Sequence, residues 1–199
     1  MTTDPFRDLP TEDPAAADRL HRRLESAANA AGLLDVAYRT IDSPVGTLLL
    51  ATTEQGMVRV AFDSEGIDAV LDELSREVSP RILRAPARLD TAAHELDEYF
   101  DGRRRAFDLP LDLRLSHGFR RTVLMHLTQI GYGHTASYGE VAEASGNPRA
   151  ARAVGSACRT NPLPLIVPCH RVVRSDGSIG QYLGGVEAKQ LLLSLEAAA

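Results

Sequence analysis

Residues 138–159, YGEVAEASGNPRAARAVGSACR, carry the pattern that decides how the second half of this chain folds. The pattern predicts a short helix from Tyr138 to Ser145, which Gly146 ends, because glycine readily adopts the left-handed conformation found after helices. Pro148 then opens a second helix, since the N–H that proline lacks has no partner in a first helical turn anyway. Two helices joined by a glycine-containing turn are typical of a helix-turn-helix.

The second helix of this motif is unusual in its small side chains, among them Ala150, Ala151 and Gly155. Small residues let a helix backbone come close to another surface. Two interpretations remain open at this point: the helix packs tightly against a neighbouring helix, or it enters a groove of DNA, with Arg152 and Arg159 supplying positive charge.

A candidate nucleophile follows in the stretch Pro168-Cys169-His170-Arg171. Proline fixes its own backbone and favours an extended residue before it, so we expect the cysteine in a stiff turn rather than inside a helix. A thiol with an ordinary pKa of about 8.5 is mostly protonated at neutral pH and needs a base to react. Adjacent residues of an extended segment point to opposite faces, so His170 is expected to act through a water molecule, oriented by Glu196. The alternative is a half-buried structural cysteine.

The first half of the chain predicts an α/β domain. Three strands, at 38–41, 47–53 and 57–62, are joined by short turns and predict an antiparallel sheet. Amphipathic helices at 67–78 and 89–100 are expected to cover one face of this sheet.

Three parts are therefore expected along the chain. The first is an N-terminal extension over 1–35, with a helix at 14–31 for which Asp13 is the predicted N-cap. The second is the α/β domain over 36–112, and the third is a mostly helical domain over 113–199.

The composition is that of a chain able to bury a core, with 44% hydrophobic and 25% charged residues. No apolar run approaches the roughly 18 residues of a membrane span, and the N-terminus lacks a basic-then-apolar signal. We therefore expect a cytoplasmic protein with no membrane partner. Two cysteines make neither a disulfide framework nor a zinc motif, so no metal and no cofactor are expected.

The charge is unevenly distributed. The net charge is −5, yet residues 117–199 hold eight basic and five acidic side chains. Positive charge that collects in the half containing Cys169 indicates a polyanionic partner for that half.

Together these stretches resemble the O6-alkylguanine-DNA alkyltransferases, also called methylated-DNA–protein-cysteine methyltransferases. The resemblance covers about residues 117–196 and is carried by Ser137–Glu140, Gly146–Gly155, Asn161-Pro162, Pro168–Val172, Gly180–Gly185 and Lys189–Glu196. It is looser in the first half, where Ser43-Pro44-Val45-Gly46 carries it. It implies a ribonuclease-H-like N-terminal α/β domain and a mostly α, winged-helix-like C-terminal domain.

The resemblance also implies an activity, DNA repair by direct reversal. A monomer would bind double-stranded DNA from the minor groove and flip O6-alkylguanine out of the duplex, with cooperative binding along DNA left open. The alkyl group would then pass irreversibly to Cys169, in a single turnover.

Residue roles follow from the same resemblance. His170 and Glu196 would activate the thiol, Asn161 would hold its turn, and Tyr138 would donate toward N3 of the guanine. Arg152 would replace the flipped nucleotide in the duplex, and the other expected DNA contacts are Ala150, Ala151, Gly155, Arg159 and Ser175. The substrate pocket would be lined by Pro168, Val172, Tyr182, Leu183, Gly184 and Cys158.

Three other functions compete with this one. A non-catalytic alkyltransferase-like protein would bind lesions without transfer, although such relatives replace the cysteine that this chain has at position 169. A transcription regulator is disfavoured because a helix of Ala and Gly has few side chains that read bases. A Cys/His hydrolase is disfavoured because no motif resembles an oxyanion hole.

Overall fold

The computed structural model describes residues 14–198, and the chain forms two compact units that divide between Leu34 and Asp35. The first unit contains α1 (Pro14–Ala30), in agreement with the helix predicted at 14–31. The predicted N-cap, Asp13, lies outside the described residues. Among the helices that are described, none combines the length and the apolar character that a bilayer span requires.

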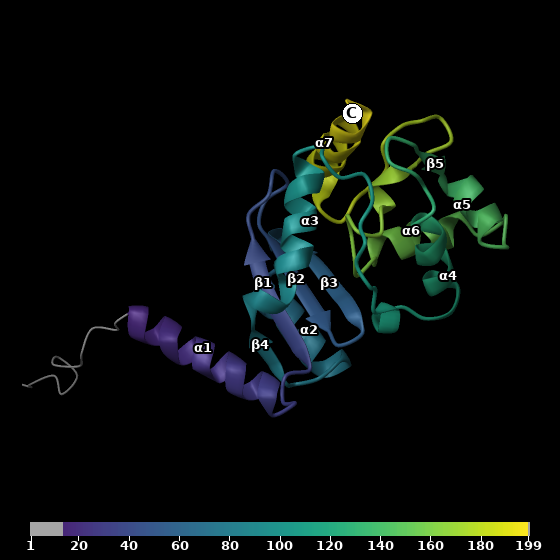
Figure 1. Ribbon diagram of the computed structural model, residues 1–199. Coiled ribbons are helices and arrows are strands. Elements are labelled where there is room, and N and C mark those ends of the chain that lie inside the picture. Colours follow the sequence, from purple (N-terminus) through teal and green to yellow (C-terminus); the bar gives the residue numbers. More distant parts are fainter. Residues whose placement is uncertain (1–13, 199) are drawn as a thin grey trace, which may run out of the picture. The chain divides into compact units, whose positions relative to one another are not determined.

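The second unit begins with a four-stranded sheet in the order β3-β2-β1-β4 (Figure 1). β1 (Val36–Ile41), β2 (Leu48–Thr53) and β3 (Gly56–Phe62) form the predicted antiparallel meander. β4 (Ile82–Arg84) pairs in parallel with β1, so the sheet is mixed and the prediction of a purely antiparallel sheet is wrong. A strand of three residues is too short to show the alternation by which strands are recognised in a sequence.

Two helices cover opposite faces of this sheet, whereas the sequence predicted that both lie on one face. α2 (Ile67–Glu77) buries Val70 and Leu74 in one hydrophobic cluster, and α3 (Asp90–Phe100) buries Leu96 in another. Successive residues of a strand point to opposite faces, so a sheet covered on both sides reads as a continuous apolar run. β2 has this character, since all six of its residues are buried.

The helical half of the unit follows a linker that forms an isolated parallel bridge to the sheet between Leu111 and Met57, and Asp112 of this linker accepts a hydrogen bond from Thr53 Oγ1 of β2. Its helices are α4 (Gly118–Leu127), α5 (Tyr138–Ala144), α6 (Ala151–Arg159) and α7 (Gly185–Ala197). α5 and α6 form the predicted helix-turn-helix, although α6 begins at Ala151, so the prediction that Pro148 opens this helix is wrong: Pro148 lies in the turn before it. β5 (Ala136–Ser137) pairs in parallel with β6 (Val172–Val173).

Local chemistry explains where the helix-turn-helix begins and turns. The Ser137 side chain accepts a hydrogen bond from the backbone N–H of Glu140, whose carboxylate accepts one from the N–H of Ser137. This reciprocal capping box satisfies two amide donors that the first turn of a helix leaves free. Gly146 has φ of +82°, the left-handed conformation expected of a glycine after a helix.

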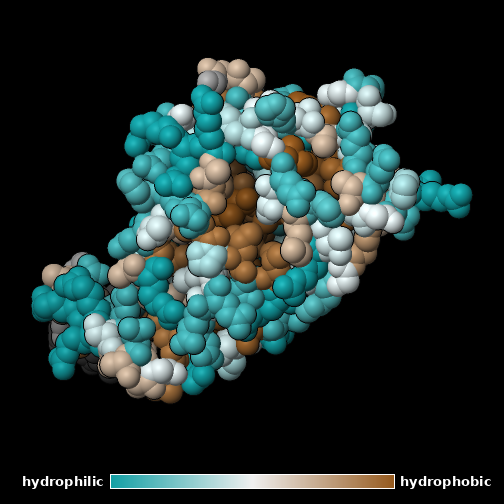
Figure 2. Space-filling view, turned by 45° about the vertical axis from the view of Figure 1, so that its right-hand side comes forward, coloured by the Kyte–Doolittle hydropathy of each residue, from teal (hydrophilic) through white to brown (hydrophobic). Residues whose placement is uncertain are grey.

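One hydrophobic core runs from the sheet into the helical half. It contains Leu48 and Leu96 from the first half, and Val123, Leu127 and Val154 from the second. On the face seen in Figure 2, exposed hydrophobic side chains gather in a hollow that hydrophilic residues border. Because the core is continuous, the sheet and the helices pack as one body.

This core yields a stability prediction on helix α4. Leu127 is fully buried, and Leu127→Ala should lower the free energy of unfolding by about 2–5 kcal/mol through lost transfer free energy and a new cavity. Met125, in the same helix, is 55% exposed, so Met125→Ala should stay within about 0.5 kcal/mol of the parent. Urea unfolding measures both. Equal losses in the two variants would show that α4 does not bury this face.

Candidate active site

The cysteine lies in a single 3-10 turn, Cys169–Arg171, directly after Pro168. The sequence had suggested an extended segment around the Cys169-His170 pair, and this prediction is wrong. The cysteine does lie in a stiff turn, as predicted. Ahead of it, Leu165 has φ of +73°, a left-handed conformation that costs a branched residue energy and persists only when the surroundings impose it.

Asn161 holds this turn. Its side-chain N–H2 donates to the carbonyl of Val167 at 2.8 Å and to Sγ of Cys169 at 3.2 Å, and its side-chain oxygen accepts from the N–H of Leu163 at 3.0 Å. Asn161 is almost fully buried, so these bonds form without competition from water. One amide side chain thus fixes the backbone before the cysteine and contacts the thiol itself.

The thiol of Cys169 is buried and protonated at neutral pH. Burial raises the pKa of Cys169 to about 11, although the hydrogen bond from Asn161 and the positive charge of Lys189 oppose the shift. Lys189 is fully buried and donates from Nζ to the carbonyl of Val172 at 2.5 Å, and burial lowers its pKa. Nucleophilic attack by Cys169 therefore requires removal of its proton.

His170 can accept a proton at one of its two ring nitrogens. Nε2 donates to Oε1 of Glu196 at 2.8 Å, so the neutral imidazole carries its proton there and presents Nδ1 as an acceptor. Nδ1 is buried and has no hydrogen-bond partner within residues 14–198. Burial lowers the pKa of His170, against the opposing effect of Glu196, so the ring is neutral at pH 7.

Glu196 is the point where these groups meet. Arg171 binds it in a bidentate pair, with Nε 2.9 Å from Oε2 and Nη2 2.9 Å from Oε1. Tyr99 Oη donates to Oε1 at 2.7 Å, and the N–H of Gly133 donates to Oε2 at 3.2 Å. Burial alone would raise the pKa of Glu196, but the hydrogen bonds from His170, Arg171 and Tyr99 outweigh it and lower the pKa to about 2.

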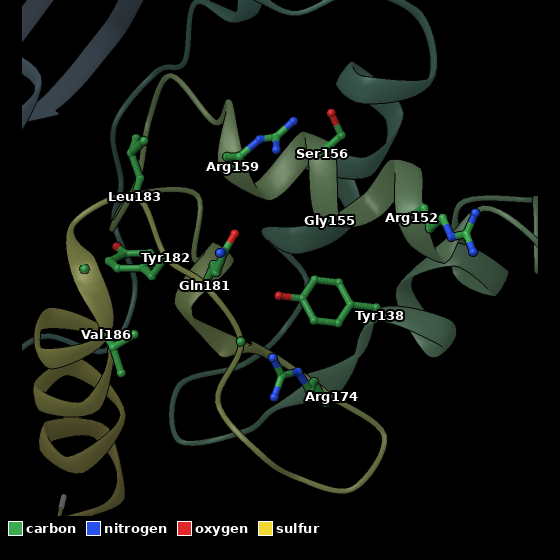
Figure 3. A pocket seen from close by; sticks show the side chains of 12 residues that line it. Tyr138, Arg152, Gly155, Ser156, Arg159, Arg174, Gln181, Tyr182, Leu183 and Val186 are labelled. Atoms are coloured by element: carbon green, nitrogen blue, oxygen red, sulfur yellow. The ribbon is translucent and has the colours of Figure 1, made fainter.

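A cavity of about 640 Å³ opens beside this buried cluster (Figure 3). Helices α5 and α6 and the loop before α7 line it with Tyr138, Arg152, Gly155, Ser156, Arg159, Arg174, Gly180, Gln181, Tyr182, Leu183, Gly185 and Val186. The ring of Tyr138 lies between Arg174 and α6 in Figure 3, and a Cβ on Gly155 would lie 3.8 Å from it. Burial raises the pKa of Tyr138, so its hydroxyl remains a proton donor.

The loop of this cavity rests on Phe62, which belongs to β3. The rings of Phe62 and Tyr182 meet edge to face with centroids 5.7 Å apart, and Tyr182 in turn meets His170 at 6.2 Å. Gly184 lies so close to Phe62 that a Cβ there would be 2.5 Å from the ring. The sheet therefore determines how near the loop comes to His170.

The structure separates the residues that the sequence grouped as one site. Tyr138, Arg152, Gly155, Arg159, Tyr182 and Leu183 line the cavity, whereas Cys169, His170, Glu196, Asn161, Val172 and Cys158 are buried. Ser175 lies exposed in the turn after β6, Ala150 and Ala151 lie at the start of α6, and Gly184 contacts Phe62. Pro168 lines a different cavity, of about 410 Å³, together with Arg105 and Tyr132.

Sequence reasoning missed three side chains next to the buried cluster: Tyr99, Arg171 and Lys189. Arg171 directly follows the Cys-His pair, and Lys189 is the single lysine of the chain, so both carried a signal. Tyr99 lies in a helix of the other half, about seventy residues before His170, and nothing in its local sequence distinguishes it.

The contact between Gly184 and Phe62 gives a testable prediction. Gly184 has φ of −80°, which suits alanine, so Gly184→Ala would act through its clash with Phe62 alone. We expect the loop to move away from the ring and a small thiol reagent to label Cys169 several-fold faster, since access limits the reaction of a buried thiol.

The matched control is Gly139→Ala, whose new Cβ would lie 3.8 Å from its nearest neighbour, Ser137 Oγ. This variant should be labelled at the parent rate. Both are compared in a Cys158→Ser background, so that the measured rate belongs to Cys169. Equal rates in all three proteins would contradict the role given to Phe62.

Comparison with known proteins assigns both halves of the second unit. The model described as 6-O-methylguanine DNA methyltransferase, ribonuclease-like domain, matches residues 36–113, and the model described as the DNA binding domain of the same proteins matches residues 118–198. A curated methylated-DNA–protein-cysteine methyltransferase of Mycolicibacterium paratuberculosis is 40% identical over 161 residues, which is 81% of this chain and 92% of that protein. The Homo sapiens protein of the same name is 37% identical over 79% of this chain and 78% of its own length.

Solved structures give the same result. The Mycobacterium tuberculosis O6-methylguanine methyltransferase superposes with a TM-score of 0.72 at 40% identity, covering 82% of this chain and 93% of that one. A structure of Mycobacterium tuberculosis OGT in complex with DNA superposes with a TM-score of 0.70 at 39% identity, covering 81% of this chain and 93% of that one.

Proposed function

This chain belongs to the 6-O-methylguanine DNA methyltransferase family, and from that premise we propose that it repairs DNA by moving an alkyl group from O6 of guanine to Cys169. The observation that carries the proposal is the buried thiol of Cys169, which lies beside a neutral His170 that Glu196 orients. Such a thiol is protected from adventitious reaction and has a base within reach.

DNA is the partner, and α6 is the element that would meet it. The helix exposes Arg152 and Arg159, while its other residues are mostly small, so its backbone can approach the floor of a groove. The minor groove suits such a helix, because recognition there depends on close approach and inserted side chains more than on base-specific hydrogen bonds. Ala150, Ala151 and Gly155 would allow that approach, and Ser175 would contact the backbone from the adjacent turn.

The substrate base would leave the stack and enter the cavity beside Tyr138. A base inside a duplex is unreachable for in-line attack at its O6 substituent, so it must be flipped. Arg152, exposed at the cavity edge, would fill the place of the flipped nucleotide. Tyr182, Leu183 and Gly184 would close over the base, with Val172 and Cys158 shaping the buried end, whereas Pro168, which lines the other cavity, would act only through the turn that holds Cys169.

In the chemical step Sγ of Cys169 attacks the alkyl carbon while the bond from that carbon to O6 breaks. The thiol proton passes to Nδ1 of His170 through a water molecule, and the Tyr138 hydroxyl protonates the departing guanine at N3. The imidazolium then releases its proton to solvent and the Tyr138 phenolate takes one up, so both residues return to their neutral forms. The net reaction converts a thiol and O6-alkylguanine into a thioether and guanine. A thioether is not readily cleaved, so each molecule of a monomeric protein acts once.

Intact-protein mass spectrometry tests this proposal. Incubation with a duplex containing one O6-methylguanine should add one methyl group, about 14 Da by atomic arithmetic, because transfer to sulfur is the final state. Cys169→Ser should show no gain, and Cys158→Ser should gain mass as the parent does. A parent protein that binds the lesion and gains no mass would instead be a non-catalytic lesion-binding protein.

Arg152 gives a second prediction, on base flipping. Arg152→Ala should slow methyl transfer from duplex DNA by about tenfold or more, yet leave transfer from free O6-methylguanine unchanged, because only the duplex requires extrusion of the base. Arg76→Ala is the control, since Arg76 is exposed on α2, outside the DNA-binding half, and donates a hydrogen bond to the carbonyl of Asp72 in its own helix. Equal loss on both substrates would contradict the role of Arg152.

A further inference from the structure

We propose that Tyr99 is a positioning residue for alkyl transfer, one that the ribonuclease-like half of the chain supplies to the catalytic pair in the other half. Its hydroxyl would hold Glu196 in the position that orients His170 and keeps that ring neutral. This inference rests on the proposed function, because it assigns a share of that reaction to a residue distant in sequence.

The Tyr99 hydroxyl contacts the same carboxylate oxygen of Glu196 that His170 contacts. The hydroxyl donates to Oε1 of Glu196 at 2.7 Å, and the same oxygen accepts the N–H of His170 at 2.8 Å. Tyr99 Oη also lies 3.5 Å from Nε2 of His170. Nε2 carries the proton that it donates to Glu196, so it cannot accept one from Tyr99. Tyr99, His170 and Arg171 therefore all donate to this one carboxylate oxygen.

The ring of Tyr99 is held rigidly enough to position another group. It is 1% exposed and meets the rings of Phe100, Phe107 and Tyr132, with centroid distances of 5.4, 5.3 and 6.1 Å. A side chain packed in this way keeps one rotamer, so its hydroxyl stays at a fixed place. Burial and the nearby Glu196 raise the pKa of Tyr99, which therefore donates a hydrogen bond throughout the physiological range.

The charges around His170 decide what this hydrogen bond does. The ionisable groups that face the ring from the elements packed against it are Glu196 and Lys189 on α7, Cys169 and Arg171 in its own turn, Tyr99 on α3 and Tyr182 in the loop. Glu196 alone stabilises the imidazolium, whereas burial, Arg171 and Lys189 disfavour it.

Donation from Tyr99 reduces the negative charge that Oε1 presents to His170. Without that hydrogen bond the carboxylate would stabilise the imidazolium more strongly, and the pKa of His170 would rise. A base must be unprotonated to accept the thiol proton, so the acid limb of the rate profile would move to higher pH. Loss of a fixed donor would also let the carboxylate move and slow the reaction at its plateau.

The experiment compares Tyr99→Phe with Tyr38→Phe, which deletes a hydroxyl from β1, where the ring packs against the hydrophobic cluster of α2 rather than that of α3. Single-turnover methyl transfer from an O6-methylguanine duplex is followed from pH 5 to 9, with DNA affinity and thermal unfolding measured alongside. In Tyr99→Phe we expect the plateau rate to fall roughly tenfold, or about 1.4 kcal/mol of barrier. We expect the acid limb to move up by about half a pH unit or more, with DNA affinity unchanged.

A second variant keeps the test valid if Tyr99→Phe folds poorly. 3-Fluorotyrosine at position 99 retains the ring and is a stronger hydrogen-bond donor, so its acid limb should move to lower pH. Tyr38→Phe should match the parent in rate and profile.

The outcomes separate this inference from the proposed function. If the parent transfers the methyl group and Tyr99→Phe shows the same plateau rate and the same acid limb of the pH–rate profile, the positioning role is refuted while the proposed function stands. A lower plateau with an unmoved limb also refutes it, because a merely structural residue would behave in that way. A parent that transfers nothing refutes the function and this inference together.

Discussion

The buried carboxylate of Glu196 is the interaction on which the rest of the site depends. It accepts hydrogen bonds from His170, Arg171, Tyr99 and Gly133, which come from three separate segments of the chain. The carboxylate depends on these partners, since a buried charge that loses its partner destabilises a protein by about 3–5 kcal/mol. Together they leave the imidazole one orientation and one tautomer, and that tautomer leaves Nδ1 buried, with no hydrogen-bond partner among the described residues.

A second constraint is that the nucleophile is kept unreactive. Burial protects Cys169 from small oxidants and electrophiles, and it also raises the pKa of the thiol to about 11. The proposed single turnover would make such protection useful, because every adventitious reaction would consume a molecule. Asn161 and Lys189 oppose the shift in the pKa of the thiol. The sheet contributes as well, since Phe62 supports the loop that lines the cavity.

Sequence patterns predicted the elements with strong local signals. Gly146 marks the turn of the helix-turn-helix, although α6 begins at Ala151 and not at Pro148, and the apolar strands before Phe62 mark the meander. The short strand β4 and the placement of α2 and α3 on opposite faces were not predicted, because both depend on contacts between segments distant in sequence. The same limit applies to the site: the Cys169-His170 pair is visible in one stretch, whereas Tyr99 becomes part of it only through tertiary packing.

The protonation state of His170 in the folded parent protein tests this account most directly. Nitrogen-15 NMR of the imidazole distinguishes a neutral ring with its proton on Nε2 from the other tautomer and from the imidazolium. The account predicts the Nε2–H neutral form at pH 7, with a pKa below the ordinary 6.5, because burial outweighs the pull of Glu196. An imidazolium at pH 7, or a neutral ring with its proton on Nδ1, would contradict it, since neither leaves Nδ1 able to accept the thiol proton.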